Sequence, residues 1–158
     1  MTNTLVVLKD HVRKEWIDYN GHMNDADYVR AFSWAVDGFM GEMGLNETFR
    51  EKAQYTMFTL ENHICYLAEM KFNEPLEVHA HVLDYDEKRV HLFLELYGAE
   101  GKRAATSEQM MMGIEQQSGR PGPFPEEISS KLKQLADEYA VETKPKEAGR
   151  VIGIRKKK

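Results

Sequence analysis

The chain has 158 residues, of which 42% are hydrophobic and 30% are charged, and its formal net charge at pH 7 is −5. This size and composition suit one globular domain, and no apolar run is long enough to span a bilayer. The negative charge argues against a general nucleic-acid binder, and the single cysteine, Cys65, excludes an internal disulfide. The N-terminal segment also lacks the order of a signal peptide. We therefore expect a cytoplasmic protein without a nucleic-acid or membrane partner.

The N-terminal part is predicted to run from a strand into a long buried helix. Residues 4–15 begin with apolar side chains and then alternate, which is typical of a strand. From Tyr28 onward, large apolar side chains recur at helical spacing, and this predicts a helix over about residues 25–43. Asn24 is suited to be the N-cap of this helix, and Asp27 is suited to complete a capping box with it.

The loop before this helix is chemically the most distinctive stretch of the chain. It places Asp18, Asn20, His22 and Asn24 at every second position, with Gly21 among them. A carboxylate, two amides and an imidazole at the mouth of a buried helix suit catalysis, because a helix N-terminus favours negative charge. An ordinary turn and a helix cap explain these residues one at a time, whereas their joint occurrence favours a functional site.

The remainder of the chain predicts four sequential antiparallel strands and a C-terminal helix. Alternating apolar residues, separated by three turns, divide residues 55–116 into the four strands. The stretch Gly119–Pro125 then interrupts regular structure, and residues 126–140 have the pattern of an amphipathic helix. This order predicts an α+β domain in which a curved antiparallel sheet wraps one central helix. The edge strand of such a sheet favours edge-to-edge dimerisation.

We expect a single domain over residues 1–140 and a basic, mobile tail over residues 141–158. The tail carries seven Lys and Arg residues but only two Glu residues, although the chain as a whole is acidic. Such a tail is usually a solvated chain end. The alternative is an electrostatic contribution to the binding of a polyanion such as a nucleotide phosphate.

The segment Asp18–His22 resembles the D-x-N-x-H element of hotdog-fold thioesterases, in the 4-hydroxybenzoyl-CoA thioesterase-like group. Residues 66–78 resemble the strand and turn of the same group, and the whole resemblance covers about residues 10–140. Five segments are similar to the betainyl-CoA thioesterases of carnitine degradation: EWIDYNGHMNDADY, FTLENHICYL, EKRVH, SEQMMMGIE and RPGPFP. The resemblance implies a hotdog fold and a homodimer or homotetramer that hydrolyses a small acyl-CoA, such as betainyl-CoA. It implies no cofactor, since the CoA thioester is the substrate.

Thioester hydrolysis suggests a catalytic role for each residue of the loop. A thioester carbonyl is electrophilic and its thiolate leaves readily, so a carboxylate and hydrogen-bond donors suffice. Asp18 would either attack the carbonyl or deprotonate a water molecule, and both mechanisms stay open. The backbone N–H groups of Gly21, His22 and Met23 would stabilise the oxyanion. Asn20 and His22 would orient the thioester, the water or the Asp18 carboxylate.

A second catalytic carboxylate is expected from the strand that begins near residue 55. Glu69 occupies the position where the resemblance places a water-activating carboxylate. Glu61 lies on the same strand face by parity and is the other candidate. Because one β-bulge would change which of them points inward, the two candidates stay open.

The two ends of the substrate need different binding groups. A quaternary ammonium such as that of betaine binds best to aromatic rings assisted by a carboxylate. The phosphates of CoA need basic side chains at the mouth of the pocket. The predicted substrate-binding residues are Gly21, Met23, Asn24, Trp16, Tyr19, Tyr66 and Arg89.

Two other functions and one other kind of site stay open at this point. The chain could hydrolyse another short or aromatic acyl-CoA, or it could be a non-catalytic hotdog module that binds acyl-CoA. Asp18 argues against the second alternative, because a pure binder needs no carboxylate facing the thioester. The cluster of His79, His81 and His91 could bind zinc, but solvent-exposed cross-strand residues explain it better, so we expect no metal.

Overall fold

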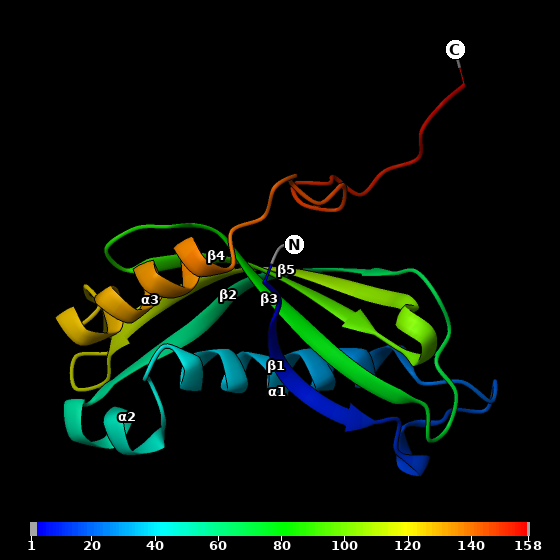
Figure 1. Ribbon diagram of the computed structural model, residues 1–158, viewed down its shortest axis with the longest axis horizontal. Coiled ribbons are helices and arrows are strands. Elements are labelled where there is room, and N and C mark those ends of the chain that lie inside the picture. The colour runs from blue at the N-terminus through cyan, green and yellow to red at the C-terminus, as the bar shows by residue number, and fades with distance from the viewer. Residues whose placement is uncertain (1–2, 158) are drawn as a thin grey trace.

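A long helix, α1 (Asp25–Glu42), lies against the concave face of a curved antiparallel sheet in the computed structural model, which describes residues 3–157 (Figure 1). The strand order is β1-β3-β4-β5-β2, and a short strand, β6, pairs with β5. The elements in chain order are β1 (Leu5–His11), η1 (Lys14–Trp16), α1, α2 (Glu47–Ala53), β2 (Tyr55–Tyr66), β3 (Pro75–Tyr85), β4 (Arg89–Tyr97), η2 (Ala99–Gly101), β5 (Arg103–Glu115), β6 (Arg120–Pro121) and α3 (Glu126–Glu138). This arrangement confirms the predicted α+β hotdog fold. No helix over residues 3–157 is both long and apolar enough to cross a membrane.

Helix α1 begins and packs largely as its sequence predicts. The Asn24 side chain accepts a hydrogen bond from the Ala26 N–H at 2.9 Å, which confirms the N-cap. Asp27 does not complete a capping box, because its carboxylate pairs with Arg30 at 3.2 Å instead. At Gly38 the helix backbone approaches β1 so closely that an added Cβ atom would lie 2.0 Å from the Val7 carbonyl oxygen.

Strand β2 is an edge of the sheet, and its pairing with β5 contains a bulge at Leu60. After the bulge, Glu61 pairs with Met110 and Tyr66 pairs with Ala105. Since side chains alternate along a strand, Tyr66 faces α1, whereas Glu61 faces the opposite side of the sheet. We call that opposite side the convex face. The extra residue reverses the alternation within β2, so Phe58 points to the convex face whereas Ile64 and Tyr66, which are also at even positions, point toward α1.

On the convex face, a chain of ion pairs connects β3, β4 and β5 to the C-terminal segment. His81 Nε2 lies 2.8 Å from a carboxylate oxygen of Glu95, and Glu95 also accepts a hydrogen bond from Arg103. Arg103 in turn donates to both carboxylate oxygens of the buried Glu147, at 2.7 and 3.0 Å. The domain boundary at residue 140 stays a prediction. The contacts of Glu147 show that part of the predicted basic tail packs on the sheet.

The Glu95 carboxylate should make stability depend on pH in the acid range. Burial raises the pKa of Glu95, but hydrogen bonds from His81 and Arg103 outweigh burial and lower the pKa from 4.5 to about 2. A lowered pKa in the folded state stabilises the fold above pH 4.5, and this contribution is lost as the pH falls toward 2. We expect a contribution of about 2–3 kcal/mol at neutral pH.

The measurement is urea unfolding of the native protein and of Glu95→Gln at several pH values between 2 and 7. The difference in free energy of unfolding should be largest near neutral pH and should shrink toward pH 2. A difference that stays constant across this range would contradict the role of the Glu95 charge.

Candidate active site

The loop between η1 and α1 folds into a tight turn that fixes the position of Asp18. The Gly21 N–H donates to the Asp18 carbonyl oxygen at 3.0 Å, and Gly21 has a φ of 80°, which favours glycine. The Asn20 N–H donates to the Asp18 carboxylate at 2.8 Å. A β-bridge between Ile17 and Met23 closes the base of the loop. These contacts hold the Asp18 carboxylate in one orientation.

The segment that follows β2 packs against this loop. The Met23 N–H donates to the Met70 carbonyl oxygen at 2.9 Å. Next to this contact, His22 Nε2 lies 3.0 Å from a carboxylate oxygen of Glu69. The fold therefore brings together the imidazole and one of the two carboxylates that the sequence predicts for the site.

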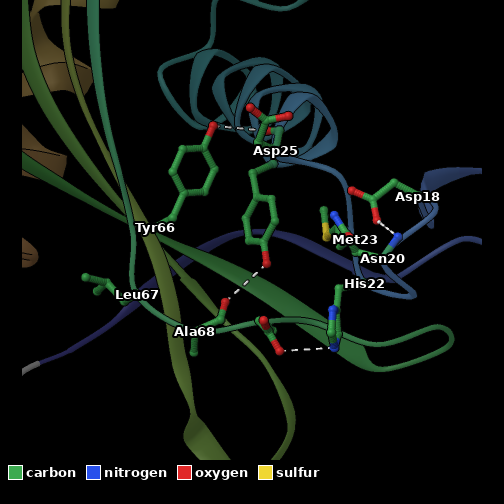
Figure 2. A pocket seen from close by; sticks show the side chains of 10 residues that line it. Asp18, Asn20, His22, Met23, Asp25, Tyr66, Leu67 and Ala68 are labelled. Atoms are coloured by element: carbon green, nitrogen blue, oxygen red, sulfur yellow. Dashed lines mark hydrogen bonds and ion pairs between the residues drawn. The ribbon is translucent and has the colours of Figure 1, made fainter.

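The loop, the start of α1 and the end of β2 border a cavity of about 630 Å³ (Figure 2). Figure 2 shows Asp18, Asn20 and His22 on one side of the cavity, with Leu67 and Ala68 on the other. The lining consists of three carboxylates, two tyrosine rings, one imidazole and four uncharged side chains. Its residues are Asp18, Asn20, His22, Met23, Asp25, Tyr28, Tyr66, Leu67, Ala68 and Glu69.

The two tyrosines of the cavity pack edge to face, with ring centroids 5.2 Å apart. Their hydroxyl groups donate to backbone oxygens, Tyr28 to Ala68 and Tyr66 to Asp25, each at 3.1 Å. Burial raises the pKa of Tyr28 to about 12 and also raises the pKa of Tyr66. Both phenols therefore stay neutral near pH 7, so the negative charge of the cavity comes from its carboxylates.

Two of the three backbone N–H groups that the sequence suggests for an oxyanion site have acceptors within the protein. The Gly21 N–H donates to Asp18 and the Met23 N–H donates to Met70. Among residues 3–157, no backbone oxygen accepts the His22 N–H. An N–H that already donates to a protein oxygen can donate to the substrate only if that hydrogen bond breaks. Of the three N–H groups predicted to stabilise the oxyanion, we therefore retain that of His22.

Several of the predicted site residues lie away from the cavity, or their side chains bind other parts of the protein. Glu61 is on the convex face because of the bulge in β2. Trp16 is only 3% exposed and packs in the core, whereas Tyr19 is 97% exposed and does not line the cavity. Arg89 pairs with a carboxylate in the turn between β3 and β4. The side chain of Asn24 is used as the cap of α1.

Other lining residues are not among those that the sequence predicts for the site. Asp25 lies in the first turn of α1, where carboxylates are favoured. This position in the sequence could have identified Asp25 as a residue of the site. Tyr28 belongs to the apolar stripe of α1, so its sequence pattern indicates only a core residue. Leu67 and Ala68 line the cavity through their position after β2, for which the sequence contains no chemical signal.

A second groove lies between α1 and the concave face of β2 and β5, and it contains a chain of polar side chains. The Thr59 hydroxyl donates to Gln109 at 3.1 Å, and the Gln109 amide donates to Ser107 at 3.0 Å. The Ser107 hydroxyl then donates to Asn62 at 2.6 Å. None of these four residues is predicted from the sequence, because they are spread over two strands and only the fold brings them together.

The convex-face histidines pair with carboxylates. His79 lies 3.0 Å from Glu77, and His91 lies 2.7 Å from Glu108. Over residues 3–157, no three His, Cys, Asp or Glu side chains gather in an arrangement that could hold a metal ion.

Comparison with protein families and curated sequences gives consistent results. Residues 12–132 match the family model of the thioesterase-like superfamily. The chain is 36% identical to a betainyl-CoA thioesterase from Pseudomonas aeruginosa over 155 residues, which cover 98% of each chain. It is also 36% identical, over 143 residues and 90% of its length, to a Rhizobium meliloti protein named L-carnitine dehydrogenase/betainyl-CoA thioesterase. The match spans 29% of that longer protein.

Two solved structures illustrate the range of structural similarity. A hypothetical protein from Staphylococcus aureus, solved in complex with CoA, is 38% identical with a TM-score of 0.92, and the match covers 98% of both chains. A DHNA-CoA thioesterase from Staphylococcus aureus is 20% identical with a TM-score of 0.73, over 85% of this chain and 94% of that chain. The second likeness concerns the fold alone.

Proposed function

This chain belongs to the thioesterase-like superfamily and is an acyl-CoA thioesterase, and we propose that its substrate is betainyl-CoA, which it hydrolyses to betaine and free CoA. Similarity over nearly the full length of the Pseudomonas aeruginosa enzyme supports this substrate. The CoA complex of the Staphylococcus aureus relative supports the CoA half of the substrate. We place the reaction in the degradation of carnitine and the protein in the cytoplasm, where its single thiol suits a reducing environment.

The observation that carries the acyl assignment is the charge of the cavity. Asp18, Asp25 and Glu69 line it together with two neutral tyrosine rings, and none of its ten lining residues is a Lys or Arg. The trimethylammonium group of betaine is a cation, which aromatic rings and carboxylates attract. The same carboxylates would repel an anionic acyl group.

The residues of the cavity suggest how water replaces the thiolate of CoA. The Asp18 carboxylate either attacks the thioester carbonyl, giving a mixed anhydride that water then hydrolyses, or it takes a proton from the attacking water. In both routes the carbon–sulfur bond breaks and CoA leaves as the thiolate. The His22 N–H is the donor we assign to the oxyanion, and Glu69 orients the His22 imidazole across their 3.0 Å contact.

We also propose that the protein is a homodimer joined along β2. This strand is an edge of the sheet, so its outer backbone N–H and C=O groups lack strand partners. The edge displays the exposed apolar side chains of Phe58, Leu60, Tyr66 and Leu67. Pairing with β2 of a second copy would satisfy the backbone groups and would also cover the groove beside α1.

The substrate proposal can be tested with a closely matched pair of thioesters. Betainyl-CoA and 3,3-dimethylbutanoyl-CoA have acyl groups of nearly equal shape, and they differ in the quaternary nitrogen and its charge. We expect kcat/KM, measured by release of the CoA thiol, to be about 5- to 30-fold higher for betainyl-CoA, because cation–π and carboxylate attraction are worth about 1–2 kcal/mol. A preference for the neutral analogue would contradict betainyl-CoA as the substrate. Release of thiol from neither thioester, nor from acetyl-CoA or benzoyl-CoA, would contradict hydrolysis and favour a binding module.

Glu69 and Glu61 provide a matched pair of substitutions at the two carboxylates that the sequence leaves open. We expect Glu69→Gln to lower kcat by about 10²-fold, because the imidazole of His22 loses its charged partner. Glu61→Gln should leave kcat within about twofold, since Glu61 is on the other face of the sheet. Steady-state thiol release from betainyl-CoA measures both, and a larger loss in Glu61→Gln than in Glu69→Gln would contradict our assignment.

A further inference from the structure

The C-terminal segment crosses the convex face of the sheet in the direction of the free edge of β2. Residues 140–143 lie beside His81 of β3. Further along, Glu147 is bound by Arg103, and the Gly149 N–H donates to the Glu108 carboxylate oxygens at 2.8 and 3.1 Å. Both anchoring residues belong to β5, which is the neighbour of β2. The segment is therefore fixed up to a point one strand short of the edge.

Beyond Gly149 the chain has no regular secondary structure, and we call residues 150–157 the arm (Figure 1). Its apolar side chains Val151, Ile152 and Ile154 are 86%, 85% and 89% exposed. Burying such β-branched side chains is worth about 1.5–3 kcal/mol each, so this exposure calls for a partner surface. The arm ends in a run of basic residues, although the chain as a whole is acidic.

The convex face of β2 carries an apolar patch beside a carboxylate. Phe58 is 53% exposed and pairs with Met112 of β5. Glu61 is exposed and pairs with Met110. Because directly opposite residues of an antiparallel pair point to the same side, these four residues lie together on the convex face.

We propose that in the homodimer the arm of each subunit crosses the β2 edge, with Val151 over the junction of the two β2 strands and with Ile152 and Ile154 packed against Phe58 and Met112 of the second copy. The basic end of the arm then lies near the Glu61 carboxylate of that copy. This inference rests on the homodimer of the proposed function, and it adds a mutual exchange of arms to the pairing of the two β2 strands.

The position of the last anchor supports this path. Glu108, which accepts the Gly149 N–H, pairs with His63 of β2, so the arm begins one strand from the free edge. Phe58 and His63 pair with Met112 and Glu108, which are an even number of residues apart on β5, so both point to the convex side. An arm that crosses the edge beside His63 therefore meets the convex face of the second copy's β2, which is the face that carries Phe58.

The length of the arm is sufficient for this contact. Eight extended residues span about 26 Å, and neighbouring strands of a sheet lie about 4.8 Å apart. The second copy's β2 and β5 would be two and three strands beyond the β5 anchor, at about 10 and 15 Å. Ile152 and Ile154 are three and five residues beyond Gly149, so they can reach the patch at about 10 and 16 Å, while Val151 lies over the junction of the two β2 strands.

A disulfide-trapping experiment tests the path of the arm directly. In a Cys65→Ser background, one chain carries Ile152→Cys and a second chain, distinguished by an affinity tag, carries Phe58→Cys. After mixing and mild oxidation, we expect a disulfide-linked heterodimer, identified by its mass. The control replaces Phe58→Cys with Lys131→Cys, an exposed position on α3. Equal linkage at both positions, or none to the Phe58→Cys chain in a protein that is dimeric, would overturn the proposal.

A dilution experiment tests the contribution of the arm to the dimer. We expect the triple substitution Val151→Ser, Ile152→Ser, Ile154→Ser to raise the dimer dissociation constant at least about tenfold, measured by sedimentation at several concentrations. The matched control, Lys156→Gln with Lys157→Gln, should change it less than about threefold at high salt, where charge interactions are screened.

The remaining outcomes of these experiments distinguish the proposed arm exchange from dimerisation itself and from a role of the arm in substrate binding. A native protein that stays monomeric at all concentrations would contradict the dimer itself. A native dimer whose dissociation constant the triple substitution leaves unchanged would contradict the arm exchange alone. If the arm substitutions raise KM for betainyl-CoA but not for betainyl-pantetheine, with an unchanged dimer, the arm binds the nucleotide phosphates and the proposal is overturned.

Discussion

Asp18→Asn should lower kcat for betainyl-CoA by about 10³–10⁴-fold while it changes the free energy of unfolding by less than about 1 kcal/mol. The Asn side chain keeps the oxygen that accepts the Asn20 N–H at 2.8 Å, so the turn of the loop is retained. An amide, however, can neither attack the thioester carbonyl nor take a proton from water. The loss should therefore appear in kcat and much less in the stability of the fold.

The control for this variant is Asp137→Asn, which removes an exposed carboxylate on α3. Thiol release and urea unfolding should be measured on both variants, and the control should keep nearly native turnover and stability. Turnover within tenfold of the native enzyme in Asp18→Asn would refute the role of Asp18 in either mechanism. A large loss of stability would instead mean that the carboxylate is needed for the loop to fold.

Gly38→Ala should destabilise the fold by about 3 kcal/mol or more, which is the largest stability effect we expect from a single added methyl group. The new Cβ atom would lie 2.0 Å from the Val7 carbonyl oxygen, well inside the sum of van der Waals radii. Because that oxygen belongs to the backbone of β1, the clash can be relieved only if α1 and β1 move apart. Such a movement would open the core along the whole helix.

Gly41→Ala is the matched control, because Gly41 lies in the same helix and an added Cβ atom there has no neighbour within 4 Å. This substitution should stabilise the protein by up to about 1 kcal/mol, since alanine favours the helix and restricts the unfolded chain. Urea unfolding of the two variants gives the comparison. Equal free energies of unfolding for both variants would show that α1 and β1 do not approach as closely as described.

The helix and the loop before it could be predicted because their signals are local. The helical spacing from Tyr28 and the cap at Asn24 depend only on neighbours in the sequence, and both agree with the structure. Glu61 shows where local reasoning fails. Its face depends on the bulge at Leu60, which arises from the pairing of β2 with β5, and an alternating pattern contains no sign of an extra residue.

The aromatic residues predicted for the site also show that a site cannot be predicted fully from the sequence. Trp16 and Tyr19 are equally suited in chemistry to bind a quaternary ammonium, and they are close in sequence. The fold buries Trp16 against Trp34, with ring centroids 5.6 Å apart, and leaves Tyr19 in solvent. Tyr66 lines the cavity because its hydroxyl bonds to the start of α1. Residue type therefore predicts which groups are suitable, whereas tertiary contacts decide which of them are used.

The strand order also determines how this chain reaches its native state. Both edge strands pair with partners that are distant in sequence: Leu5 of β1 with Ala80, and Tyr55 of β2 with Glu115. Among the five long strands of the described residues, only β3, β4 and β5 follow one another directly as neighbours in the sheet. Closing long loops is entropically unfavourable, so we expect these three strands to assemble first and the edges to join late, with refolding in milliseconds to seconds. Until β2 joins β5, its apolar residues are exposed to other chains, and refolding at low protein concentration should give the highest yield.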